Sequence, residues 1–174
     1  MVTMKQATAT VTHTTIASRL GELTVVARDG AVTGLYFPHH WYRPDRAGFG
    51  ARSDAGFGEV REQLGEYLAG DRRRFDLLVR ARGGELQQRV WDLISQIPYG
   101  ETVSYGELAR DLADGSTAQQ VGAAVGRNPV CLLIPCHRVV GAGGKLTGFA
   151  GGLRRKRFLL DMERGVAHPQ SRLF

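Results

Sequence analysis

The chain has 174 residues, which is enough for one ordinary domain or two small ones. Hydrophobic residues make up 43% of it, so a packed core is expected, while two cysteines are too few for a disulfide framework and no apolar run reaches the length of a membrane span. The net charge of +6 suits a polyanionic partner. Because no charged start precedes a long apolar run, we expect no signal peptide. A thiol that must stay reduced fits the cytoplasm.

The N-terminal half predicts a small mixed sheet. Alternating Ala, Val and Thr in residues 1–17 indicate an edge strand after a loose start. Residues 23–27 and 31–37 indicate two further strands, and the Asp29-Gly30 pair between them is typical of a hairpin turn. We therefore expect these two strands to be antiparallel neighbours.

A long loop is predicted over residues 38–58, which contain Pro, several Gly and scattered charge. Its adjacent His39 and His40 are more typical of solvated side chains than of a metal site, and no ligand set accompanies them. The spacing of apolar residues then predicts a helix over residues 59–69, with Gly70 as its C-terminal cap.

A linker with two adjacent glycines divides the chain. Residues 75–79 predict another strand, and residues 80–84 predict the linker itself. We therefore expect one domain at residues 1–79 and a second at residues 85–174. Basic residues exceed acidic ones by three in each half, so charge alone does not show which half meets a polyanion.

The C-terminal half is predicted to be mainly helical. An apolar stripe over residues 86–97 predicts a helix that Pro98 ends. Ser104 and Glu107 form a capping box that opens a short helix, and Ser116 is predicted to cap a second one. Two short helices joined by a Gly-bearing turn are typical of a helix-turn-helix, although plain packing also gives such pairs.

A thiol and an imidazole follow a short apolar run at residues 130–134. The run is rich in Leu and β-branched residues and is bounded by Pro, so it predicts a buried strand or extended segment. Pairing should stop at Pro135, because proline cannot donate to a ladder. The chain thereby delivers Cys136 and His137 to the end of a rigid element, where His and Arg favour the reactive thiolate.

Other interpretations of these residues stay open at this point. Free cysteine is usually a small buried hydrophobe, which is the favoured interpretation for Cys131. The cluster of Cys131, Cys136 and His137 suggests a metal site, but a fourth ligand is missing. A cysteine hydrolase would instead need a distant histidine, which the sequence does not exclude.

The motif PCHRVV at residues 135–140, with Asn128-Pro129 upstream, resembles the active-site signature of the O6-alkylguanine-DNA alkyltransferases. The resemblance covers residues 18–165 and is strongest after Leu86. It implies an α+β fold, with an N-terminal ribonuclease-H-like small mixed sheet and helix. It also implies a C-terminal, winged helix-turn-helix-like helical domain that carries the active site.

The resemblance further implies DNA repair by direct reversal of damage. Family members transfer the alkyl group from O6-alkylguanine in double-stranded DNA to their cysteine, here Cys136, and are inactivated by it. The target base must be rotated out of the stack, and the second helix of the pair enters the minor groove. The implied protein is a monomer that needs no cofactor, metal or membrane.

DNA contacts are implied for the two short helices. Tyr105, at the start of the first, would push the phosphate beside the flipped nucleotide. Gln119 stands where the family normally has an arginine that fills the gap in the stack, and it brings no charge. Because Gln119 follows Ser116 by three residues, a capping role is the alternative. DNA contact is also implied for Ala118, Gly122 and Arg138.

Three further residues are implied to serve the transfer. His137 would take the thiol proton, directly or through one water. Glu163, on the last predicted helix, would orient that imidazole; an acid in a last turn opposes the helix dipole and so needs a partner. Asn128 would tie the helix pair to the active-site segment by side-chain hydrogen bonds.

The glycine-rich loop at residues 141–152 is implied to wrap the flipped base. Backbone groups of Val139 and Ala150 would contact guanine. Phe149 and Ala150 stand where the family often has tyrosine and serine, which affects pocket preference. The basic run at residues 154–157 is more typical of a solvated helix start than of a phosphate site.

Two rival functions are compatible with the helices alone. Alkyltransferase-like proteins bind lesions with the same fold but lack the acceptor cysteine, and the presence of Cys136 argues against that function. A helix-turn-helix transcription factor would bind selected sequences and keep its cysteine inert. A cysteine hydrolase, by contrast, would recover its thiol after each turnover.

Overall fold

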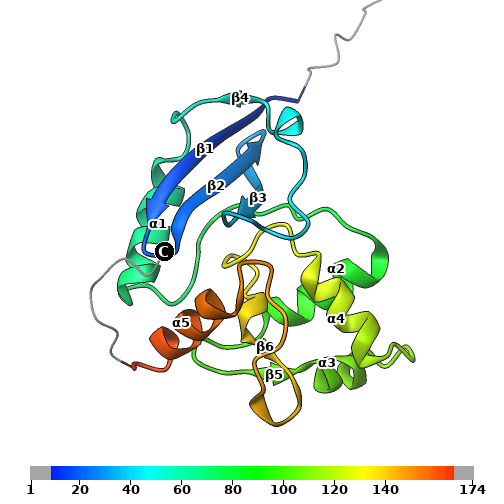
Figure 1. Cartoon of the computed structure of the whole chain (residues 1–174). Helices are drawn as coiled ribbons and strands as arrows, with labels where there is room; N and C mark the ends of the chain where they lie inside the picture. The colour runs from blue at the N-terminus through cyan, green and yellow to red at the C-terminus, as the bar shows by residue number, and fades with distance from the viewer. Residues whose placement is uncertain (1–8, 167–174) are drawn as a thin grey trace, which may run out of the picture.

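The N-terminal half of the computed structural model, which describes residues 9–166, is a four-stranded sheet with one helix against it (Figure 1). The strand order is β3-β2-β1-β4, in which β1 pairs antiparallel with β2 and parallel with β4. The elements are β1 (Val11–Ser18), β2 (Gly21–Arg28), β3 (Ala31–Tyr36), β4 (Ala51–Arg52) and helix α1 (Gly58–Ala69). Residues 1–8 of the predicted loose start lie outside the described residues.

The hairpin predicted at Asp29-Gly30 is confirmed. Both turn residues have positive φ, at 50° and 78°, which is the backbone that a tight hairpin between twisted strands requires. Gly70 caps α1 in the left-handed conformation, as predicted. The prediction that residues 1–17 form an edge strand is wrong, because β4 covers β1 at Thr12 and His13.

Two further predictions for this half need correction. Residues 38–58 are not a plain loop, because they hold a short 3-10 helix, η1 (Arg46–Phe49), and strand β4, with Phe49 and Phe57 buried. Residues 75–79 form no strand but only a single bridge from Val79 to β3. The Asp76 amide donates to a glutamine side chain of α1, so it is not available for a ladder.

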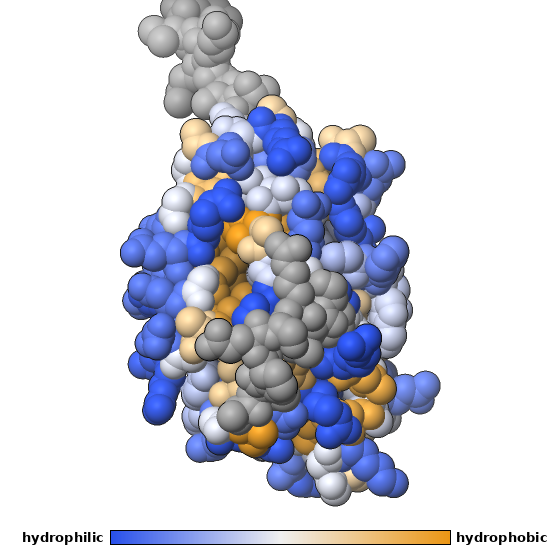
Figure 2. Space-filling view, turned by 60° about the vertical axis from the view of Figure 1, so that its left-hand side comes forward, coloured by the Kyte–Doolittle hydropathy of each residue, from blue (hydrophilic) through white to orange (hydrophobic). Residues whose placement is uncertain are grey.

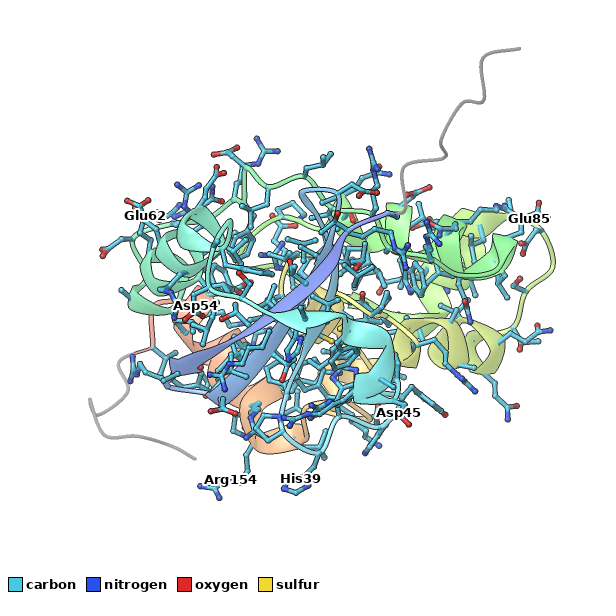
Figure 3. The ribbon with its side chains drawn as sticks, turned by 90° about the horizontal axis from the view of Figure 1, so that it is seen from above. His39, Asp45, Asp54, Glu62, Glu85 and Arg154 are labelled. Atoms are coloured by element: carbon cyan, nitrogen blue, oxygen red, sulfur yellow. The ribbon has the colours of Figure 1, made fainter. Side chains whose placement is uncertain are left out.

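The C-terminal half is a group of helices around a two-stranded parallel sheet, so the predicted α+β architecture is confirmed. Its elements are α2 (Glu85–Ser95), β5 (Val103–Ser104), α3 (Tyr105–Leu112), α4 (Ala118–Gly126), η2 (Cys136–Arg138), β6 (Val139–Val140), η3 (Ala142–Gly144) and α5 (Leu153–Glu163). Figure 3 shows Glu62 of α1 and Glu85 of α2 at opposite ends of the molecule, with the sheet passing between them.

The caps of the helix pair are settled by side-chain hydrogen bonds. Ser104 and Glu107 form the predicted capping box of α3. The cap of α4 is Thr117 rather than the predicted Ser116, and its box partner is Gln120. Gln119 therefore has no capping role and lies exposed on the first turn of α4.

One hydrophobic core joins the two halves. The apolar run at residues 130–134 lies in it, but as a tight turn rather than the predicted strand, because Leu132 has a φ of 72° and the Ile134 amide donates to the Val130 carbonyl. The turn is attached to β3, whose Leu35 amide donates to the Pro129 carbonyl at 2.8 Å. Among residues 9–166, no helix is long and apolar enough to cross a membrane.

Candidate active site

Cys136 begins the short helix η2, directly after the buried turn. Its side chain is almost wholly buried, with 4% of the residue exposed. The sulfur of Cys131, on the turn itself, lies 3.7 Å from the sulfur of Cys136. Cys131 is therefore buried as predicted, but it also contacts the candidate nucleophile, which the interpretation as plain core did not anticipate.

The Asn128 side chain holds this turn in shape. Its Nδ2 donates to the Ile134 carbonyl at 2.8 Å, and its Oδ1 accepts from the Val130 amide at 3.0 Å. Asn128 itself is buried and follows α4 closely. The structure thus places Asn128 between the helix pair and the cysteine, where the sequence predicts it.

The surroundings of Cys136 favour its thiolate. The hydrogen bond from the Cys131 thiol lowers the pKa of Cys136, and burial opposes this effect. The Asn128 side chain and the positive charge of Lys156 lower the pKa further. The contact between the two sulfur atoms, together with burial, raises the pKa of Cys131 well above its ordinary value. Of the two thiols, Cys136 is therefore the one that ionises first.

A buried polar network surrounds His137. Its Nε2 lies 2.8 Å from Oε1 of Glu163, and the Tyr67 hydroxyl donates to the same oxygen at 2.5 Å. The Gly100 amide donates to Oε2 of Glu163 at 2.9 Å. The predicted pairing of Glu163 with His137 is thus present, while Tyr67 was predicted only as part of the helix over residues 59–69, without a role in the site.

The network determines which nitrogen of His137 carries the proton. Burial alone would raise the pKa of Glu163, but hydrogen bonds from His137, Arg138 and Tyr67 hold that pKa well below its ordinary value. The carboxylate is therefore an acceptor, so Nε2 of the imidazole must be the donor. Burial lowers the pKa of His137, and its Nδ1 has no hydrogen-bond partner among the described residues. Nδ1 is thus the basic nitrogen that is left to accept a proton.

Arg138 is not placed to contact DNA, so that prediction is wrong. Only 7% of Arg138 is exposed. Its guanidinium donates to both oxygens of Glu163 at 2.8–3.2 Å. It also donates to the Ile97 carbonyl at 2.7 Å. A bidentate pair with the buried Glu163 carboxylate satisfies the hydrogen-bond donors of Arg138 inside the protein. Because this carboxylate lies 25 residues further along the chain, no local sequence pattern indicates the pair.

Lys156 also contradicts the interpretation of residues 154–157 as a solvated run. Its side chain is fully buried, and Nζ donates to the carbonyls of Val139, Thr147 and Gly148 at 2.5–3.1 Å. Burial lowers the pKa of Lys156 to about 8, and the nearby Cys136 opposes that shift. Lys156 therefore holds the glycine-rich loop in place and adds positive charge near the nucleophile.

A small cavity opens beside Cys136, with a volume of about 50 Å³. Phe149 and Ala150 line it as predicted, whereas Val139 is not among its lining residues, and the Val139 carbonyl accepts a hydrogen bond from Lys156. The whole lining consists of Trp41, Tyr105, Gly122, Val125, Gly126, Cys136, Gly148, Phe149 and Ala150. The cavity thus joins the cysteine to the face of α3 and α4.

Larger hollows elsewhere lack the chemistry of this one. A cavity of about 420 Å³ lies between β1 and α1, on the side that Figure 2 brings forward, where apolar side chains are surrounded by hydrophilic ones. Another, of about 600 Å³, lies beside Tyr99 and Pro135. Neither of these described cavities is lined by a cysteine or a histidine. Size alone therefore does not identify the site.

The predicted DNA-contacting residues of α3 and α4 share one surface. Ala118 and Gln119 are exposed at the start of α4. A Cβ added to Gly122 would lie 3.6 Å from the Tyr105 ring, an ordinary van der Waals distance, so α4 and that ring are close neighbours. The Tyr105 hydroxyl donates to the Thr147 carbonyl at 3.4 Å, which places Tyr105 at the mouth of the small cavity.

The adjacent histidines differ in their surroundings. His40 is buried, and its ring packs edge-on against Tyr36 with centroids 5.2 Å apart, so the prediction that it is solvated is wrong. Burial lowers the pKa of His40 to about 4. Within residues 9–166, no group of three or more His, Cys, Asp and Glu side chains is arranged to hold a metal ion.

Comparison with known proteins gives the same family for both halves. The family model described as 6-O-methylguanine DNA methyltransferase, ribonuclease-like domain, matches residues 11–81. The model described as 6-O-methylguanine DNA methyltransferase, DNA binding domain, matches residues 85–165.

Individual relatives match over nearly their whole length. The methylated-DNA–protein-cysteine methyltransferase of Mycolicibacterium paratuberculosis is 46% identical over 93% of this chain and 98% of the relative. The protein of the same name from Mycobacterium tuberculosis strain H37Rv is 43% identical over the same shares. A crystal structure of Mycobacterium tuberculosis OGT in complex with DNA aligns with a TM-score of 0.83 at 40% identity, covering 90% of this chain and 94% of that one.

Proposed function

Because the chain belongs to the 6-O-methylguanine DNA methyltransferase family, we propose that Cys136 is the residue that accepts the alkyl group. The activity of the chain is transfer of a methyl group from methylated DNA to a cysteine of the protein, which repairs the DNA by direct reversal. The observation that carries the assignment is the low-pKa thiol of Cys136 at the bottom of a cavity that opens toward α3 and α4. A lesion-binding protein without transfer is disfavoured because this thiol is present.

The transfer is an in-line displacement at the alkyl carbon of O6-alkylguanine. The thiolate of Cys136 forms the new S–C bond while the C–O6 bond breaks and its electrons pass to guanine. His137 takes the thiol proton at Nδ1 through a water, since no direct hydrogen bond joins the two side chains among the described residues. That proton is then returned to the guanine that leaves. Because the new thioether has no route back, each molecule acts once.

The target base reaches Cys136 by leaving the duplex. Tyr105 and the exposed start of α4 form the DNA-contacting surface, with α4 in the minor groove. Residues 85–174 then carry the DNA-binding and acceptor roles, and residues 1–79 carry a largely structural one. The protein acts as a monomer, and its two free thiols, 3.7 Å apart, require a reducing compartment such as the cytoplasm.

Stoichiometry tests this function. The protein is incubated with a twofold to tenfold excess of duplex oligonucleotide that carries one O6-methylguanine, and the repaired base is counted by nuclease digestion and chromatography. We expect repair to stop at one guanine per protein molecule. Continued turnover, or an unchanged amount of O6-methylguanine, would contradict the proposal.

Removal of the Cys131 thiol should move the pH dependence of the transfer. Cys131→Ala loses the donor that lowers the pKa of Cys136, so the inflection of the rate should move to higher pH. Near pH 7 we expect a loss of about fivefold, since a weak hydrogen bond to a charged group contributes on the order of 1 kcal/mol. At alkaline pH, where both proteins hold the thiolate, the rates should converge. Cys131→Ser keeps a hydrogen-bond donor, so its pH profile should resemble that of the wild type. Equal pH profiles for Cys131→Ala and the wild type would show that the Cys131 thiol does not lower the pKa of Cys136.

Gln119→Arg should accelerate repair in duplex DNA. Gln119 is exposed and free of capping, so an arginine there can reach the gap that the extruded base leaves. We expect a gain of about fivefold on double-stranded substrate, as one good base contact contributes roughly 1–3 kcal/mol. The rate with free O6-benzylguanine should not change, because that substrate needs no extrusion. Equal gains on both substrates would show that Gln119 acts on the transfer itself.

A further inference from the structure

The cavity beside Cys136 has one wall from the N-terminal half. Every other lining residue belongs to α3, α4, the cysteine itself or the glycine-rich loop, whereas Trp41 comes from the segment after β3. In Figure 1 this segment passes along the top of the C-terminal half. A Cβ added to Gly148 would lie 3.9 Å from the Trp41 ring, so the indole is in contact distance of the loop.

The cavity is too small for the base that the proposed function requires. Its volume of about 50 Å³ is far below the roughly 300–1,000 Å³ of ordinary ligand pockets. A purine therefore enters only if one wall moves.

Several of the other walls are held in place. The carbonyl of Gly148 accepts from the buried Lys156 at 3.1 Å, and Phe149 is buried with its ring 5.5 Å from that of Phe37. Cys136 follows the turn that Asn128 fixes. Val125, on α4, is part of the hydrophobic core. Movement of any of these would break buried contacts.

Trp41 differs from these walls in both exposure and bonding. It is 60% exposed, and its indole makes no hydrogen bond among the described residues. The residues on either side are anchored: His40 is buried against Tyr36, and the Arg127 guanidinium lies 3.8 Å from the centroid of the Tyr42 ring. The backbone is thus held while the indole remains able to rotate.

We propose that Trp41 is a base-binding residue that forms the movable outer wall of the alkyl-acceptor pocket. Its indole turns outward to admit the extruded base and then packs against the face of that base. The inference rests on the proposed function and adds a base-binding residue from the N-terminal half. Aromatic side chains suit this role because every base presents a π-face to stack on.

A modification rate and a binding affinity test the movable wall, with Trp41→Ala, Trp41→Phe and, as the control, Leu78→Ala. Leu78 is also an exposed apolar residue of the N-terminal half, at 58%, but does not line the pocket. In Trp41→Ala, iodoacetamide should modify Cys136 several-fold faster, because the cavity stays open. The apparent affinity for free O6-benzylguanine should fall about tenfold, because the stacking partner is lost. Trp41→Phe and the control should stay near the wild type.

Tryptophan fluorescence gives a second readout. The chain has two tryptophans, and Trp91 is buried, so acrylamide quenches mainly Trp41. In Cys136→Ala, which cannot react, saturating O6-benzylguanine should reduce that quenching. Unchanged quenching, together with wild-type rates for Trp41→Ala, would overturn the inference. If the wild type does not remove the methyl group from O6-methylguanine in DNA, the proposed function is wrong. If the wild type removes it and Trp41→Ala behaves like the wild type in the tests above, only the role of Trp41 is wrong.

Discussion

Glu163→Gln should lower the free energy of unfolding by about 3–5 kcal/mol, the usual loss when one partner of a buried ion pair is removed. Glu163 is buried and accepts from Arg138, His137 and Tyr67. Without the carboxylate, the buried guanidinium of Arg138 keeps its charge and loses its counter-ion. Urea unfolding at pH 7, followed by circular dichroism, measures the difference.

The pH dependence of this difference has a defined sign. The pKa of Glu163 lies below its ordinary value in the folded state, so the stabilisation is complete above the unfolded pKa of about 4.3 and is lost as the pH falls further. The gap between wild type and Glu163→Gln should therefore be largest near neutrality and shrink below about pH 4. Glu62→Gln, at an exposed site on α1, is the matched control and should change stability by less than about 0.5 kcal/mol. A loss below 1 kcal/mol for Glu163→Gln would contradict the buried pair.

Cys136→Ser should abolish alkyl transfer without unfolding the protein. A serine hydroxyl in the same place does not ionise near neutral pH, so the nucleophile is lost while the shape of the side chain is kept. Single-turnover assays with protein in excess over O6-methylguanine DNA should detect no repair. Cys131→Ser is a demanding control, because its thiol lies only 3.7 Å away and its loss should leave repair in place. Repair by Cys136→Ser would assign the chemistry to another residue.

Local chemistry made several features predictable from sequence. The Asp29-Gly30 hairpin and the Ser104 capping box each depend on residues within a few positions of one another, and both are present. Local patterns of this kind need no knowledge of the distant fold. The roles of Asn128 and Cys136 came instead from the resemblance to a known family, and the Asn128 side chain does hold the turn that precedes Cys136.

Features that depend on distant partners were missed. Arg138 and Lys156 look like surface charges in sequence, but a carboxylate on α5 and three loop carbonyls make their burial favourable. The run at residues 130–134 has the composition of a strand, yet Leu132 adopts a positive φ in the tight turn that precedes Cys136. Tyr67 reaches His137 across 70 positions, which apolar periodicity does not reveal.

The segment at residues 38–58 also has distant contacts that its sequence did not reveal. Its Pro, Gly and charge content is typical of a loop, and much of it lacks regular structure. Composition did not show that Phe57 packs in the main core, or that His40 and Phe49 pack against Tyr36. Nor did it show that Trp41 reaches the acceptor cavity. The N-terminal half therefore contributes to the site directly, in addition to supporting it.

Peptide mapping of the reacted protein tests the central claim most directly. The wild type is incubated with a slight excess of O6-methylguanine DNA, digested, and sequenced by tandem mass spectrometry. We expect a single methyl group on Cys136 and none on Cys131. A methyl group on any other residue, or an unmodified Cys136 after the DNA has been repaired, would contradict the account.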